Sequence, residues 1–171
     1  DFTHPDLAFI TSMYSLTPGA TDLYYSYDRG KTWKGPYQME IPGVGQMSAR
    51  TNYIVNDTRD CMAFLNSNGT EENPLRQPFL AQTTDGGITW KLVSWIMEGK
   101  HGIMPSGVRT SPTNLFAAVR RREGDHGWNS GHLSTNNGRT WEEVISPVDD
   151  LGNGNPPMVL RLNDGRIAIT Y

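Results

Sequence analysis

Short β-rich runs with several apolar residues recur along the chain, and turn residues separate them. The clearest runs lie at 60–67, 114–121 and 165–171. Each begins at a glycine, asparagine or aspartate and continues with apolar residues over a strand-like length. Eighteen glycines and eleven prolines supply many turn positions, and long amphipathic runs at helical spacing are scarce. The pattern therefore predicts an all-β chain of short antiparallel strands.

One motif occurs three times, with a spacing of roughly 50 residues. It reads SYDRGKTW at 26–33, TTDGGITW at 83–90 and STNNGRTW at 134–141. In a hairpin turn, Asp or Asn can bind backbone amides two residues on, and glycine supplies a positive φ. A catalytic group need not appear three times, and asparagine replaces aspartate once, so we interpret the motif as structural. Its defining residues are Asp28, Gly30, Trp33, Asp85, Gly87, Trp90, Asn136, Gly138 and Trp141.

The strand-like runs around the motif also repeat, and each unit reads as four antiparallel strands with the motif between the third and the fourth. Two complete units are expected at 48–96 and 105–147, with three strands of a preceding unit at 7–40 and two of a following unit at 156–171. This period fits the blades of a β-propeller, which closes with four to eight blades. We therefore predict that residues 1–171 form a single partial β-propeller domain of about three blades, whose partner is the remainder of its own propeller.

The repeated Ser-x-Asp-x-Gly-x-Thr-Trp pattern resembles the Asp box, or BNR repeat, of the sialidase (neuraminidase) superfamily, and the likeness extends over nearly the whole chain. The resemblance implies a six-bladed β-propeller of sialidase type in the full protein. It also implies an exo-acting glycoside hydrolase that removes a terminal acidic sugar from a glycan. In that family three arginines bind the substrate carboxylate, because a guanidinium matches a carboxylate in a bidentate way. A tyrosine paired with a glutamate, and an aspartate acting as acid and base, carry the chemistry.

In such a blade the three motifs share one rim, so the opposite rim should hold the ligand site. Arg50 matches the first arginine of the family by position, although RTN stands there in place of Arg-Ile-Pro. Arg109 lies within a strand, where a buried charge needs a carboxylate partner or a ligand. The candidate substrate-binding residues are Arg50, Arg109, Arg121, Arg122, His101 and Trp128, and the candidate catalytic residues are Glu123 and Asp125.

Strand alternation sharpens the prediction for the arginine run at 120–122. It sends Arg120 and Arg122 to one side of the sheet and Arg121 to the other. At least one of these side chains should therefore face the central cleft of the propeller.

Charge and composition exclude several classes of protein. Fifteen basic and eighteen acidic residues give a net charge of −3, which disfavours a general nucleic-acid binder. No stretch approaches the roughly 20 apolar residues of a membrane span, and Cys61 is the single cysteine. No metal site and no cofactor are predicted. Two further functions stay open: a uronate-specific hydrolase or lyase, which RTN and the histidines favour, and a non-catalytic glycan-binding propeller.

Overall fold

The structure is a computed structural model that describes residues 1–16, 19–48, 52–70, 72, 74–152 and 155–171. All regular secondary structure in these residues is β, as predicted. The strands are β1 (Ala8–Leu16), β2 (Gly19–Ser26), β3 (Lys34–Gln38), β4 (Gln46–Ser48), β5 (Tyr53–Val55), β6 (Cys61–Gly69), β7 (Gln77–Thr83), β8 (Lys91–Trp95), β9 (Ile103–Arg109), β10 (Leu115–Glu123), β11 (His126–Ser134), β12 (Glu142–Glu143), β13 (Met158–Arg161) and β14 (Ile167–Thr170).

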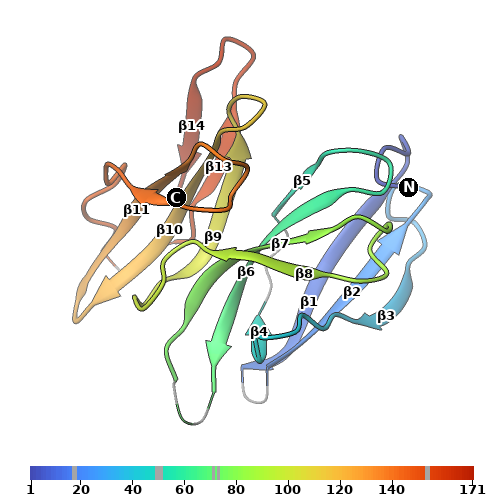
Figure 1. The fold of residues 1–171 in the computed structure, drawn as a ribbon, viewed down its shortest axis with the longest axis horizontal. Helices are drawn as coiled ribbons and strands as arrows, with labels where there is room; N and C mark the ends of the chain where they lie inside the picture. Colours follow the sequence, from blue (N-terminus) through green and yellow to red (C-terminus); the bar gives the residue numbers. More distant parts are fainter. Residues whose placement is uncertain (17–18, 49–51, 71, 73, 153–154) are drawn as a thin grey trace.

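The strands form antiparallel sheets that follow one another in chain order (Figure 1). Sheet 1 has the order β1-β2-β3, and sheet 2 has the order β4-β6-β7-β8, with β5 also paired to β6. Sheet 3 has the order β9-β10-β11-β12, and sheet 4 is the β13-β14 hairpin. Strand β9 contacts β5 of sheet 2 and β13 of sheet 4, so the first strands of successive sheets are neighbours. This is the arrangement of consecutive propeller blades around a common axis.

Apolar side chains on alternating positions hold the sheets together. On β6, Cys61, Ala63 and Leu65 pack toward sheet 1, while Met62 and Phe64 pack toward sheet 3. Strand β10 repeats this division, with one set of side chains toward sheet 2 and the other toward sheet 4. Because successive residues of a strand point to opposite faces, each central strand contributes to two interfaces. Its sequence is consequently a continuous apolar run.

The three Asp-box turns share one hydrogen-bond pattern. In each, the side-chain oxygen of Asp28, Asp85 or Asn136 accepts a bond from the hydroxyl two residues earlier and from the threonine backbone N–H four residues later. The threonine hydroxyl forms a further bond to the same side chain. These bonds close the turn within the motif itself, which explains why so many of its positions are specified.

Two consecutive residues with positive φ complete each turn. They are Arg29 and Gly30, Gly86 and Gly87, and Asn137 and Gly138. Hydrogen bonds from Ser26 and Thr32 lower the pKa of Asp28 to about 2. Those from Thr89 and Thr83 hold the pKa of Asp85 well below its usual range. Both carboxylates are therefore ionised acceptors throughout the physiological range.

We expect Asn136→Ala to lower the free energy of unfolding by about 0.5–2 kcal/mol, by analogy with the loss of a side-chain cap. The reason is that the Ser134 hydroxyl and the Thr140 backbone N–H lose their shared acceptor. Urea denaturation measures the change. The matched variant Asn136→Asp keeps the acceptor and should stay close to the parent at neutral pH. Equal losses in both variants would contradict this assignment.

Candidate functional site

The two rims of the stacked sheets are formed by different turns and loops. On one rim the second and third Asp-box turns each meet the turn between the first and second strands of their own sheet: Arg59 Nη2 donates to Asp85 O at 3.3 Å, and Asn137 N donates to Thr113 O at 2.8 Å. We call this the Asp-box rim. The opposite rim holds the β6–β7 and β10–β11 loops and the connections between sheets, and there the Gly102 N–H donates to Arg76 O at 3.0 Å.

Arg121 is a largely buried cation on the opposite rim. It lies near the end of β10 with its side chain 18% exposed, and its Nη1 is 3.4 Å from Glu143 Oε1. Its guanidinium carbon lies 4.9 Å from the ring centroid of Trp128, which is its partner across the β10–β11 pair. This is a cation–π contact on a rigid hairpin. The side chain is therefore fixed in place by two different neighbours.

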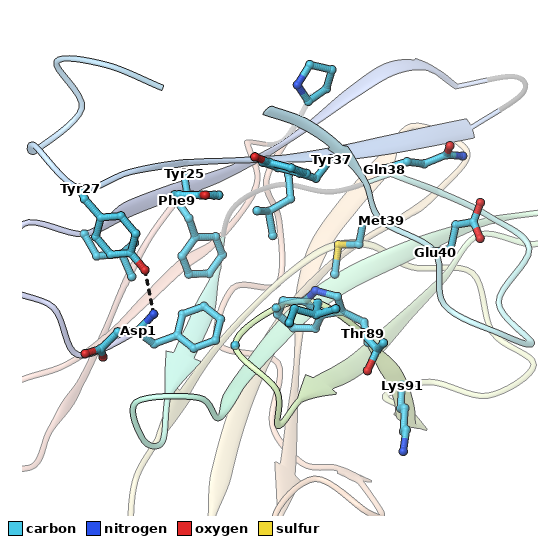
Figure 2. Close-up of a pocket in the computed structure, with 18 of the residues that line it drawn as sticks. Asp1, Phe9, Tyr25, Tyr27, Tyr37, Gln38, Met39, Glu40, Thr89 and Lys91 are labelled. Carbon is cyan, nitrogen blue, oxygen red and sulfur yellow. Dashed lines mark hydrogen bonds between the residues drawn. The ribbon is translucent and has the colours of Figure 1, made fainter. Parts of the chain in front are cut away.

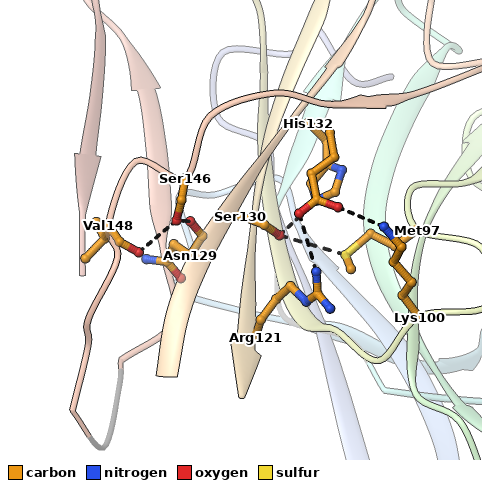
Figure 3. A network of polar contacts seen from close by, with 9 residues as sticks. Met97, Lys100, Arg121, Asn129, Ser130, His132, Ser146 and Val148 are labelled. Atoms are coloured by element: carbon orange, nitrogen blue, oxygen red, sulfur yellow. Dashed lines mark hydrogen bonds and ion pairs between the residues drawn. The ribbon is translucent and has the colours of Figure 1, made fainter. Parts of the chain in front are cut away.

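Glu143 links Arg121 to Lys100, which lies in the segment between β8 of sheet 2 and β9 of sheet 3. Its Oε2 accepts a bond from Lys100 Nζ at 3.1 Å, so one carboxylate lies between two cations (Figure 3). Partial burial opposes ionisation, but Lys100 and Arg121 lower the pKa of Glu143 overall. Because both pairs are partly exposed, each adds little to stability.

Arg76 and His101 lie close to these two ion pairs. Partial desolvation and the charges of Arg76 and Arg121 lower the pKa of His101, so these groups lie within electrostatic reach of one another. We name Arg76, Lys100, His101 and Arg121, with Glu143 as their carboxylate, the basic rim cluster. Among the described residues, Arg121 Nε is buried without a hydrogen-bond partner. The three cations Arg76, Lys100 and Arg121 outnumber the one carboxylate of the cluster, and this excess suits a carboxylate or another anion.

A buried Ser–His pair lies beneath the cluster. Ser130 Oγ is 2.9 Å from His132 Nε2, and His132 is 2% exposed. Burial, together with Arg121 and Lys100 and against the opposing effect of Glu143, lowers the pKa of His132 to about 4. The imidazole is thus neutral near pH 7. Since neither side chain reaches solvent, the pair has a structural role and does not form a nucleophile–base pair open to substrate.

The β10–β11 hairpin carries the other residues singled out from the sequence. Arg122 donates from Nε to Gly124 O at 2.9 Å and lies 3.8 Å from Asp125 Oδ1. Asp125 is fully exposed at the tip of the hairpin, and Glu123 is exposed beside it. Arg122 and the two carboxylates are not part of the basic rim cluster, and Arg50 lies outside the described residues.

Trp128 is enclosed by other side chains. Besides Arg121, it stacks with His126 at 5.1 Å between ring centroids and 20° between ring planes. His126 Nε2 lies 2.7 Å from Asp149 O, which links the hairpin to the connection toward sheet 4. Trp128 is half-buried, and these contacts let it help to position Arg121.

The expectation for Arg109 is wrong in its position and in its partner. Arg109 ends β9 on the Asp-box rim, where Nη1 donates to Asn137 Oδ1 at 2.7 Å and Nη2 donates to Asn56 Oδ1 at 2.9 Å. Nη1 also donates to Pro112 O at 2.8 Å. Amide and carbonyl oxygens take the place of the expected carboxylate, because the first strand of the sheet runs toward the Asp boxes. Arg109 joins sheet 3 to the β5–β6 turn of sheet 2.

Sequence reasoning missed Lys100, Glu143 and His132. The register of sheet 3 pairs His132 with Glu143 and Arg121 with Trp128 on the same face of the sheet. Counting that register back from the third Asp box would have placed Glu143 and His132 on the same face of sheet 3 as Arg121, four residues along β11 from its partner Trp128. Lys100 belongs to another sheet and leaves no such signal.

Neither a metal centre nor a membrane helix is found in the part of the chain that the structure describes. No three His, Cys, Asp or Glu side chains there could hold a metal ion. No helix there has the length and apolar character to cross a bilayer.

Burial of neutral His132 predicts acid sensitivity. Its pKa in the folded state lies below the ordinary value of about 6.5, so the unfolded state takes up the proton first. The free energy of unfolding should fall as pH drops from about 6.5 to about 4, by up to about 3 kcal/mol at about 1.4 kcal/mol per pKa unit. Urea unfolding of the parent and of His132→Gln at several pH values measures this contribution. The variant should show the weaker pH dependence in that window, and identical slopes would refute the assignment.

Arg109→Ala should lower the free energy of unfolding by about 1–3 kcal/mol, because it removes charge-assisted hydrogen bonds within sheet 3 and the one to Asn56 of sheet 2. Affinity for any ligand of the opposite rim should not change. Arg166→Ala, which removes an exposed arginine paired with nearby Asp164 in the β13–β14 turn, is the control for a lost surface charge. If folded Arg109→Ala protein bound a ligand of the opposite rim more weakly than the parent, Arg109 would have to be counted as a ligand-binding residue.

Comparison with known proteins identifies the fold. The BNR/Asp-box repeat family model matches residues 24–34 and 83–92. A protein of unknown function from Dyadobacter fermentans is 21% identical with a TM-score of 0.68, over 89% of this chain and 44% of that chain. The Hadza microbial sialidase Hz136 is 16% identical with a TM-score of 0.64, over 89% of this chain and 32% of that chain. No curated protein matches the sequence.

The NanB sialidase of Streptococcus pneumoniae is also similar, at 18% identity and a TM-score of 0.58. The match covers 94% of this chain and 25% of that chain, so the chain spans less than half the length of each of these proteins. The chain has a sialidase-like BNR-repeat fold and forms part of a β-propeller, as the sequence predicted.

Proposed function

We propose that the full-length protein is a sialidase-like glycoside hydrolase that removes a terminal acidic sugar from a glycan. The observation that carries the proposal is the basic rim cluster, where Lys100 and Arg121 share the Glu143 carboxylate and Arg76 adds further positive charge. Guanidinium groups bind carboxylates in a fixed geometry, so such a cluster selects acidic sugars over neutral ones. The fold shared with two sialidases supports the same class of substrate.

In this proposal Arg121 binds the sugar carboxylate. It is held in place by Glu143 and Trp128, so its guanidinium is preorganised to bind a second carboxylate. Arg76 adds positive potential, and His101, whose pKa is lowered, offers a neutral imidazole N–H as a hydrogen-bond donor. Arg50 stays a candidate through its position in the repeat alone.

The chemical step makes demands on the site that binding does not. A proton donor acts within hydrogen-bond reach of the substrate, where water is scarce. Glu123 and Asp125 lie at an exposed hairpin tip and need a bound substrate to extend to them. That exposure favours a second candidate function, a propeller that binds acidic glycans without cleaving them.

Turnover by the full-length protein separates these functions. A fluorogenic sialoside and uronate-containing oligosaccharides are the substrates, and N-acetylneuraminic acid and glucuronic acid are the ligands for calorimetry. Release from the sialoside supports the hydrolase, whereas turnover on uronates alone replaces it with a uronate-specific enzyme. Binding without turnover supports the second candidate. Failure to bind either acid overturns the proposal.

Arg121→Ala should weaken binding of the acidic sugar by about 10–100-fold, since a charge-assisted hydrogen bond contributes about 1.5–3 kcal/mol. Arg121→Lys should lie in between, because lysine keeps the charge without the fork of donors. Titration calorimetry measures the affinity, and a thermal melt shows whether each variant is folded. Arg166→Ala on the Asp-box rim is the charge control. Unchanged affinity in both Arg121→Ala and Arg50→Ala would refute the assignment.

A further inference from the structure

A large groove lies away from the basic rim cluster, between sheet 1 and sheet 2. Its volume is about 1020 Å³, and β3, the segment after it and the second Asp-box turn at 86–91 line it (Figure 2). Ligand pockets usually measure about 300–1,000 Å³, so the groove has room for more than a single sugar ring.

In the neighbouring interface, between sheets 2 and 3, hydrogen bonds close the region that corresponds to this groove. Between sheets 2 and 3, Ser94 Oγ donates to Gly138 O and accepts a bond from Trp141 Nε1 at 3.0 Å. A Cβ added to Gly138 would clash with Leu80. The third Asp-box turn is therefore packed closely against sheet 2.

Between sheets 1 and 2 the same positions are occupied differently. Tyr37, like Ser94, stands four residues after the motif tryptophan and pairs with the matching leucine, Leu23 in place of Leu80. Trp90 lines the groove, and its buried Nε1 has no hydrogen-bond partner among the described residues. The serine that closes one interface is thus a tyrosine at the other, and the groove stands open.

Aromatic rings form the upper wall of the groove. Tyr37 is 49% exposed and stacks on Tyr25, with 5.7 Å between ring centroids and 15° between ring planes. Tyr27 and Phe9 extend this wall (Figure 2). A flat exposed ring held from behind offers a platform for the apolar face of a pyranose.

The edges of the groove are polar. Gln38, Glu40, Thr89 and Lys91 line it and offer both donors and acceptors (Figure 2). The charged side chains in the lining are Asp1, Glu40 and Lys91, and the Asp1 amino group also lies there, donating to Tyr27 Oη at 2.8 Å, so neither sign is in excess. This balance suits a neutral sugar, whose hydroxyls donate to carboxylates and accept from an ammonium group.

We propose that the groove is a binding site for a neutral disaccharide unit of a glycan, with one ring stacked on Tyr37. A purely apolar peptide would leave the polar edge groups without partners, and the lining has no excess of positive charge to attract an anionic ligand. This site is independent of the acidic-sugar site on the rim and requires no catalysis.

The test measures binding of lactose and of N,N′-diacetylchitobiose to the full-length protein by saturation-transfer NMR and calorimetry. We expect Tyr37→Ala to weaken binding of the preferred disaccharide by about tenfold or more, while Tyr37→Phe keeps the ring and most of the affinity. Tyr37→Ser should also lose binding and should melt no lower than the parent, because the serine can accept the Trp90 N–H as Ser94 accepts that of Trp141.

Ser94→Ala is the matched control at the closed interface. It should lower the melting temperature, because Trp141 loses its partner, and leave disaccharide binding unchanged. Lack of binding by both disaccharides overturns the proposal, as does binding that survives Tyr37→Ala. Loss of acidic-sugar binding or turnover does not bear on it, so the two proposals fail separately.

Discussion

The side-chain-capped turn of the Asp box is the constraint on which the rest of this structure depends. Because Asp28, Asp85 and Asn136 satisfy the turn with groups of their own motif, each hairpin closes without help from another sheet. The turn always joins the third strand to the fourth, so all three turns lie on one rim. The connections between successive sheets therefore lie on the opposite rim, where the basic rim cluster lies.

Packing between the sheets is a second constraint, and the repeated motif packs differently at the two interfaces. The alternating apolar residues of β6 and β10 fill both interfaces of their sheets. At the outer edge, however, one side chain decides whether the interface closes. Ser94 binds the turn and the tryptophan of the next motif, whereas Tyr37 is too large to take that place and leaves a groove.

The candidate site was partly predictable. Arg121 and Trp128 meet because they are direct partners in a hairpin, a relation that strand register makes local. Lys100 joins them from a different sheet, and the sequence contains no signal of that approach. Arg109 was misplaced because the pattern shows that a strand is present, while the rim on which its end lies depends on the direction in which the strand crosses the sheet.

The sequence by itself determined the all-β class, the repeat, the turns and the alternation along the central strands, since each depends on residues close together in the chain. The tertiary structure decided which cations share Glu143, why His132 is neutral, and where two sheets leave space between them. Those properties arise from contacts between sheets, and the distance between such residues along the chain carries no information about them. The same physical division separates the self-contained Asp boxes from the two binding sites proposed for this protein.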